Sequence, residues 1–182
     1  MLRESEARDR PAYVELFASP EVGTYIGGSR PRAEVEAAVP ELPGRRFGSF
    51  VVDLDGAMIG MVTLDSRADG ETEIGYLFLP SAWGHGYAAE ACAAALAWFA
   101  SARPGEPVAL RTQTANVASM RLAAKLGFAE VERFQAWDAE QWLGLRSPGH
   151  AVCLSSCSTA LLGRSPALSK PETPSRSWCA GR

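Results

Sequence analysis

The chain has 182 residues, of which 47% are hydrophobic and 21% are charged, and its formal net charge is −3. This size and composition suit one folded domain with a single sizeable core and argue against disorder of the whole chain. The excess of acidic residues disfavours a nucleic-acid partner, which needs a basic face.

The N-terminal segment MLRESEARDR is charged from its third residue, so it does not support a secretory signal. The longest nearly uninterrupted apolar run, ACAAALAWFA at residues 91–100, is shorter than the roughly 20 residues that a membrane-spanning helix needs. We therefore expect a cytoplasmic protein with no membrane partner. The four cysteines show no spacing typical of zinc sites or disulfide frameworks, and no metal is expected.

Helices are expected first along the chain. The segment 6–18 places Tyr13, Leu16 and Phe17 on one face at helical spacing, and the segment 31–42 begins with a proline and contains another. These patterns predict two short amphipathic helices.

Strands follow these helices. The segment 47–64 consists of two β-rich runs around Asp55 and Gly56, a dipeptide that suits a tight hairpin turn with positive φ. A third strand is predicted at residues 72–79, after the turn signal SRADGE, and Pro80 ends it.

The alanine-rich helix that comes next has an apolar face at helical spacing, which consists of Cys92, Ala95, Leu96 and Phe99. Because Glu90 is its only charge before Arg103, we expect this helix to be buried on most sides. Pro104 and Gly105 end it.

The rest of the folded part predicts three more strands, at residues 107–114, 129–137 and 140–147. A short helix at 116–128 lies between the first two of them, with Asn116 as its N-cap and Gly127 at its C-terminal end.

A glycine-rich segment, WGHGYAAEA at residues 83–91, lies between the third strand and the alanine-rich helix. Glycine allows sharp turns and lets another molecule approach the backbone closely. Glycines that open a helix also direct unpaired N–H groups and the positive end of the helix dipole at what lies in front of them. Phosphate suits that position, so the segment predicts an anion-binding site.

The composition changes near Pro148. Four of the 18 basic residues and one of the 21 acidic residues lie in 148–182, so residues 1–147 carry a formal charge of −6 and the remainder +3. Residues 148–182 are rich in Ser and Pro, and their apolar residues do not recur at helical or strand spacing. We expect one domain over 1–147 and a disordered tail over 148–182 that resembles a frameshifted or read-through end.

Two motifs in this order resemble the GNAT acetyltransferase superfamily, over residues of roughly 8–147. The stretch 83–88 matches the family's phosphate loop, Gln/Arg-x-x-Gly-x-Gly/Ala, except that Trp83 replaces the first residue. The second motif, Asn-x-x-Ser/Ala-x-x-Leu-x-x-Lys-Leu-Gly-Phe, is reproduced by Asn116, Ser119, Leu122, Lys125, Leu126, Gly127 and Phe128. The stretches EIGYLFLP and GYAAEA look most like the RimJ/RimL-like branch, whereas the family's first strand is reduced to MLR or lost.

The resemblance implies a mixed α/β GNAT fold with a central, mostly antiparallel sheet that is splayed at the cofactor site and flanked by helices. It implies transfer of acetyl from acetyl-CoA to an amine, either a protein N-terminus or a small molecule, and it leaves a homodimer open. The cofactor-binding residues that it implies are Leu77, Phe78, Leu79, Gly84, His85, Gly86, Tyr87, Ala88, Asn116 and Ser119.

Catalytic roles are implied for two residues. Most of the superfamily has a tyrosine, as the donor to the departing thiolate, where this chain has Ala123. In the RimJ/RimL-like branch the serine at position 119 is thought to take its place. Alternatively, Ser119 only bonds the local backbone. Glu73 acts as a base through water, or it is an ordinary solvent-facing carboxylate. Asn116 is expected to cap its helix, and the resemblance also implies that it orients the thioester or contacts the cofactor. His85 is expected to be solvated or to contact phosphate.

Some alternatives remain open at this level. Trp137 and Trp142 line the amine pocket or belong to the core, where aromatic strand residues are common. The spacing of Gly84, Gly86 and Ala89 also satisfies the Rossmann dinucleotide fingerprint. A protein of GNAT shape that binds acetyl-CoA without catalysis is the other alternative.

Overall fold

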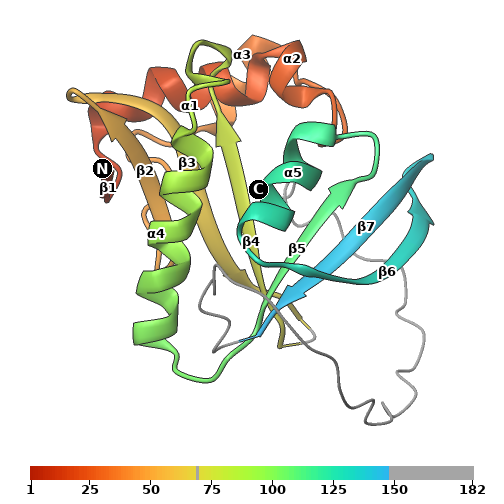
Figure 1. Ribbon diagram of the computed structural model, residues 1–182. Coiled ribbons are helices and arrows are strands. Elements are labelled where there is room, and N and C mark those ends of the chain that lie inside the picture. The colour runs from red at the N-terminus through yellow and green to blue at the C-terminus, as the bar shows by residue number, and fades with distance from the viewer. Residues whose placement is uncertain (69, 148–182) are drawn as a thin grey trace, which may run out of the picture. The chain divides into compact units, whose positions relative to one another are not determined.

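The computed structural model describes residues 1–68 and 70–147 (Figure 1). The predicted tail, 148–182, lies outside the described residues. The strands are β1 (Leu2–Arg3), β2 (Ser49–Leu54), β3 (Ala57–Ser66), β4 (Thr72–Phe78), β5 (Val108–Gln113), β6 (Ala129–Ala136) and β7 (Ala139–Arg146). They form one sheet in the order β1-β2-β3-β4-β5-β7-β6, and only β4 and β5 pair in parallel. The predicted mixed, mostly antiparallel sheet is confirmed.

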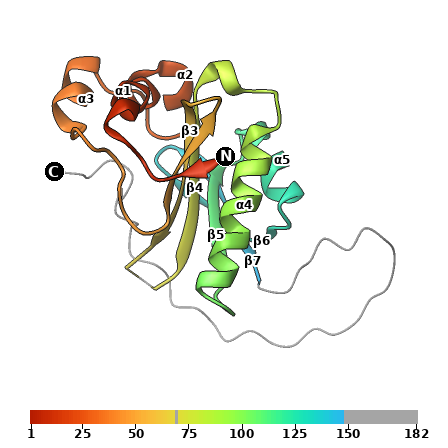
Figure 2. The same cartoon turned by 90° about the vertical axis from the view of Figure 1, so that its left-hand side faces the viewer.

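Helices cover both faces of this sheet. They are the 3-10 turns η1 (Ala7–Asp9) and η2 (Pro80–Ala82) and the helices α1 (Arg10–Ala18), α2 (Pro20–Gly23), α3 (Arg32–Ala38), α4 (Tyr87–Ala102) and α5 (Val117–Lys125). Helices α4 and α5 lie on one face, and α1, α2 and α3 lie on the other (Figure 2). The two predicted N-terminal helices are α1 and α3, whereas the single turn of α2 was not predicted.

Two apolar cores lie on the two faces of the sheet. The first packs α4 and α5 against the strands, and the second packs α1 and α2 against β2, β3 and β4. Side chains alternate along a strand, so Ile74 and Phe78 of β4 belong to the first core and Leu77 to the second. Trp142 is 4% exposed in the first core, which confirms its interpretation as a core residue. Trp137, at the β6–β7 turn, is exposed.

The predicted hairpin between β2 and β3 is confirmed. Asp55 and Gly56 both have positive φ, 52° and 85°, as a type I′ turn requires. The first strand is two residues long and pairs antiparallel with β2, Leu2 opposite Val52.

Helix α4 is buried along one face only, so the expectation that it is buried on most sides was wrong. Cys92 and Leu96 are buried in the first core, but Ala93, Ala94 and Ala97 are exposed. Alanine has the highest helix propensity and a very small side chain, so it lies on a solvated helix face at little cost. A lack of charge therefore did not indicate burial here.

Strands β4 and β5 separate soon after they begin, and this opening positions the site. They pair only at Thr72–Val108 and Glu73–Ala109. Because the two strands are parallel, their carboxyl ends lie at the same edge of the sheet, and the helices that follow them, α4 and α5, both begin there (Figure 1). Two helix N-termini therefore lie at the wide end of the opening.

Candidate active site

The glycine loop precedes α4 at the wide end of the opening. Gly84 and Gly86 have φ values of 80° and 84°, in the left-handed region that favours glycine. A Cβ added to either glycine meets no heavy atom within 4 Å, so the backbone conformation, and not lack of space inside the protein, requires glycine here.

A row of backbone N–H groups is left available by this loop. Within residues 1–68 and 70–147, no backbone or side-chain acceptor bonds the N–H groups of residues 84–88. The first N–H groups of α4 point away from the helix, where its dipole is positive. His85 stacks on Tyr87 with ring centroids 5.5 Å apart, so its imidazole lies beside the same loop. The arrangement fits a diphosphate anion.

The backbone groups of β4 that face the opening are those of Tyr76 and Phe78, whereas Leu77, Phe78 and Leu79 were expected to bind the cofactor. The N–H of Leu79 donates to Ile59 O of β3 at 2.9 Å. Backbone groups of successive residues point to opposite sides of a strand, so those of Leu77 and Leu79 face β3, and those of Tyr76 and Phe78 face the opening. Of the three strand residues expected to bind the cofactor, Phe78 alone presents its backbone to the opening.

Ser119 lies in the first turn of α5. Its hydroxyl does not bond the local backbone, which was the alternative to a catalytic role. Its N–H donates to the side-chain Oδ1 of Asn116 at 3.1 Å, which confirms Asn116 as the N-cap. Its Oγ lies 2.5 Å from Tyr76 Oη. Ser119 itself is 8% exposed. The serine hydroxyl therefore bonds a residue of β4, across from its own helix.

Tyr76 is the site residue that the sequence analysis did not assign. It lies on β4 beyond the last residue that pairs with β5, and its half-buried ring packs against the first core. Burial raises the pKa of its hydroxyl above the ordinary value of 10.0, and the hydrogen bond with Ser119 offsets this only in part. A signal was present, because Tyr76 is the polar member of an otherwise apolar strand face with Ile74 and Phe78.

Glu73 is neither solvent-facing nor free. It is 6% exposed, and its Oε2 lies 2.6 Å from Arg67 Nη1 and 2.7 Å from Arg111 Nη1. Arg111 also pairs with Glu71 at 2.6 Å. Both guanidinium groups bond the same carboxylate oxygen of Glu73. Because this cluster lies where β4 and β5 are still paired, at the closed end of the opening, it favours a structural role for Glu73.

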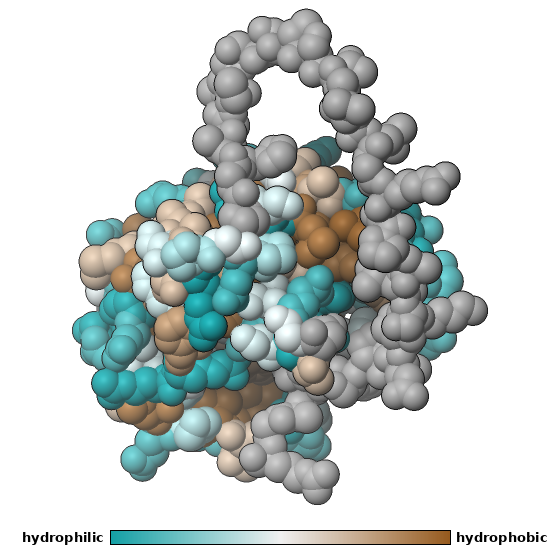
Figure 3. Space-filling model, turned by 90° about the horizontal axis from the view of Figure 1, so that it is seen from below, coloured by the Kyte–Doolittle hydropathy of each residue, from teal (hydrophilic) through white to brown (hydrophobic). Residues whose placement is uncertain are grey.

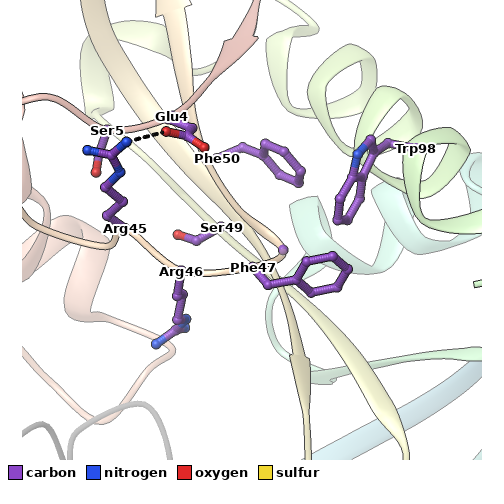
Figure 4. Close-up of a pocket in the computed structure, with 9 residues that line it drawn as sticks. Glu4, Ser5, Arg45, Arg46, Phe47, Ser49, Phe50 and Trp98 are labelled. Atoms are coloured by element: carbon purple, nitrogen blue, oxygen red, sulfur yellow. Dashed lines mark ion pairs between the residues drawn. The ribbon is translucent and has the colours of Figure 1, made fainter. Parts of the chain in front are cut away.

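A separate hollow of about 390 Å³ lies beside β2 and α4. Phe47 and Phe50 approach Trp98 there, with ring centroids 5.0 and 4.9 Å away, and Arg45 at the rim pairs with Glu4 at 3.1 Å (Figure 4). Hydrophobic patches also lie among hydrophilic ones on the lower surface (Figure 3). No predicted site residue lines the hollow, so we place the candidate site at the opening between β4 and β5.

Residues 1–68 and 70–147 contain no group of three or more His, Cys, Asp or Glu residues that is arranged to hold a metal ion. Within the same residues, no helix has the length and apolar character needed to cross a membrane.

Comparison with known proteins agrees with this geometry. The family model described as an acetyltransferase (GNAT) domain matches residues 1–129. The protein YkkB of Bacillus subtilis (strain 168) is 28% identical over 152 residues, which cover 75% of this chain and 86% of YkkB.

Two solved structures share the fold. The GNAT-family acetyltransferase of Bacillus anthracis superposes with a TM-score of 0.69 at 22% identity, over 80% of this chain and 93% of that one. RimL, a ribosomal L7/L12 α-N-protein acetyltransferase solved with coenzyme A, gives 0.66 at 14% identity, over 81% and 93% of the two chains. At these identities the likeness shows the fold alone. The Rossmann alternative is wrong, because that fold requires a mostly parallel sheet and this one has a single parallel pair.

Proposed function

Because the chain belongs to the GNAT acetyltransferase family, whose members use acetyl-CoA, we propose that it transfers the acetyl group of acetyl-CoA directly to a primary amine. The observation that carries this proposal is the opening between β4 and β5, which has a row of available N–H groups at its mouth and the Tyr76–Ser119 hydroxyl pair beside it.

The residues at the opening fit the acyl donor. Backbone N–H groups of residues 84–88 and the positive end of the α4 dipole suit its diphosphate. Its pantetheine arm is peptide-like, and the backbone of Tyr76 and the N–H of Phe78 face the opening beyond the last β4–β5 pair, which suits β-augmentation. The Phe78 carbonyl is already bonded by the Trp83 indole. When bound, the donor supplies an acetyl group on a thioester.

Ser119 is the residue that we propose as donor to the departing thiolate. Its hydroxyl is held on the first turn of a capped helix, and its N-cap, Asn116, fixes that turn. We assign Glu73 a structural role, because both of its guanidinium partners engage the same carboxylate oxygen. Proton removal from the amine then falls to water.

Peptide N-termini are the first class of acceptor to examine, because the stretches EIGYLFLP and GYAAEA look like the RimJ/RimL-like branch. Small-molecule amines are the other class. A cytoplasmic location and assembly as a homodimer stay predictions.

The test measures binding and transfer separately. Acetyl-CoA at 100 times its dissociation constant adds roughly 2.7 kcal/mol to the native state and raises the melting temperature, whereas NADP leaves it unchanged. With peptides that have free N-termini and with small primary amines, release of the free thiol and mass spectrometry of the product then report transfer. Stabilisation by NADP but not by acetyl-CoA contradicts the proposal. Binding without transfer to any amine supports a non-catalytic acetyl-CoA-binding protein.

A further inference from the structure

We infer that Tyr76 is a positioning residue of the acetyl-transfer centre, which holds Ser119 so that the two hydroxyls together direct one hydrogen-bond donor at the departing sulfur. The inference rests on the proposed function. It assigns a role to a strand residue 43 positions before Ser119 in the sequence.

The number of protons in the pair supports this role. Two neutral hydroxyls carry two protons, and the 2.5 Å contact between Tyr76 Oη and Ser119 Oγ uses one of them. Neither hydroxyl has a second hydrogen-bond partner in the part of the chain that the structure describes. One O–H therefore stays available to a group in the opening.

Both members of the pair are held in place by their own elements. The Tyr76 ring packs against the first core, and Ser119 is fixed through its N–H by Asn116 Oδ1. The contact joins β4 to the helix that follows β5, so it links the elements on the two sides of the opening. A donor with so little freedom is already oriented when charge develops, which is the condition for strong electrostatic stabilisation.

The pair stays neutral near physiological pH. Burial raises the pKa of Tyr76, and Cys92 of α4 is its titratable neighbour. Burial also raises the pKa of the Cys92 thiol, to about 12, so no thiolate forms beside the pair. The tyrosine proton is therefore present throughout the range in which the enzyme is assayed.

The hydroxyl pair acts by hydrogen bonding, and the protons balance through water. The amine nitrogen bonds to the acetyl carbon, the carbon–sulfur bond breaks, and its electron pair stays on sulfur. The pair donates a hydrogen bond to that sulfur as it gains charge. One proton leaves the amine for water and one reaches the sulfur from water, so the products are an amide and a thiol and the hydroxyl pair is unchanged.

The test compares Tyr76→Phe, Ser119→Ala and the double variant. Each single substitution lowers kcat by about 10²-fold with little change in KM for acetyl-CoA, and the double variant loses no more than the worse single one. Tyr13→Phe is the matched control, because Tyr13 is also a buried tyrosine but belongs to the second core. It leaves kcat unchanged.

A second readout needs no acceptor and no turnover. A donor aimed at sulfur stabilises bound coenzyme A as the thiolate, so calorimetric affinity for coenzyme A rises between pH 7 and 9 in the parent protein, since a thiol titrates near ~8.5. This rise is reduced in Tyr76→Phe and in Ser119→Ala and is kept in Tyr13→Phe. Desulfo-coenzyme A shows no such rise in any of the proteins.

Three outcomes overturn the inference: unchanged kcat and an unchanged affinity profile in Tyr76→Phe, multiplicative losses in the double variant, or a profile that the single substitutions do not alter. If the parent shows the pH-dependent affinity but transfers acetyl to no amine, the proposed function fails while the placement of the hydroxyl pair holds.

Discussion

The indole of Trp83 is bonded to the last residue of β4, because its Nε1 donates to Phe78 O at 2.9 Å. The carbonyl of Phe78 faces the opening, so the indole connects the start of the glycine loop to the strand edge that lines the site. The residue that departs from the family's loop motif thus has a definite structural partner.

Replacing this indole while keeping a ring tests the connection. Trp83→Phe loses one hydrogen bond, worth about 1 kcal/mol, and lowers the affinity for acetyl-CoA roughly fivefold because the loop is less well held. Trp137→Phe is the matched control, since Trp137 and Trp83 are both 48% exposed. Calorimetry measures both affinities, and equal values for the two variants contradict the prediction.

The left-handed backbone of the loop leads to a second prediction. Gly86→Ala costs about 1 kcal/mol of stability from its φ of 84°, and it also weakens acetyl-CoA binding because its Cβ projects where a ligand approaches the backbone. Gly105→Ala, with a φ of 87° and equally open surroundings beyond the end of α4, has the same stability cost and normal affinity. Melting curves with and without acetyl-CoA separate the two effects. Equal affinity losses in the two variants would place the cause in general strain.

Substitutions at Ser119 and at its helix cap, Asn116, are expected to affect different properties of the protein. Ser119→Ala lowers turnover by about 10²-fold, as expected for a lost hydrogen-bond donor, with little change in acetyl-CoA affinity. Asn116→Ala removes the cap and costs about 1 kcal/mol of stability. Steady-state kinetics at a temperature where both variants are folded checks this. Normal turnover in Ser119→Ala would show that its hydroxyl does not assist the departing sulfur.

The first strand is anchored by a charge pair with a predictable pH response. Arg3 bonds both carboxylate oxygens of Asp9 at 2.7 Å, and this contact lowers the pKa of Asp9 below its usual value. A carboxyl whose folded-state pKa is lowered contributes stability that is complete above its unfolded pKa, about 4, and that is lost as pH falls through the folded value. We therefore expect stability to decline below about pH 4.

Arg3→Gln tests this response. It leaves Asp9 buried without its ion pair, which raises the pKa of that carboxyl and moves the loss of stability to higher pH. Arg8→Gln breaks only an exposed pair with Glu6 and changes stability by no more than about 0.5 kcal/mol. Denaturant titrations from pH 7 to pH 2.5 measure both. A parallel shift of the two profiles would show that Arg3 is not the cause.

The sequence by itself determined the elements and the glycine loop, because these depend on local chemistry. Alternating and helical apolar periods arise from the geometry of single strands and helices, and the turn at Asp55-Gly56 and the cap at Asn116 need only neighbouring residues. The splayed sheet could be expected from the order of the two motifs through the family resemblance.

Tertiary structure decided which side chains meet. Glu73 was expected at a solvated position, but strand pairing brings Arg111, 38 residues later, onto the same carboxylate. The hydroxyl partner of Ser119 comes from Tyr76, because α5 packs over the face of β4 to which that residue points. Such contacts depend on strand register and on how helices settle onto the sheet. No local pattern specifies either, since the same alternation of apolar residues is compatible with many registers and packings.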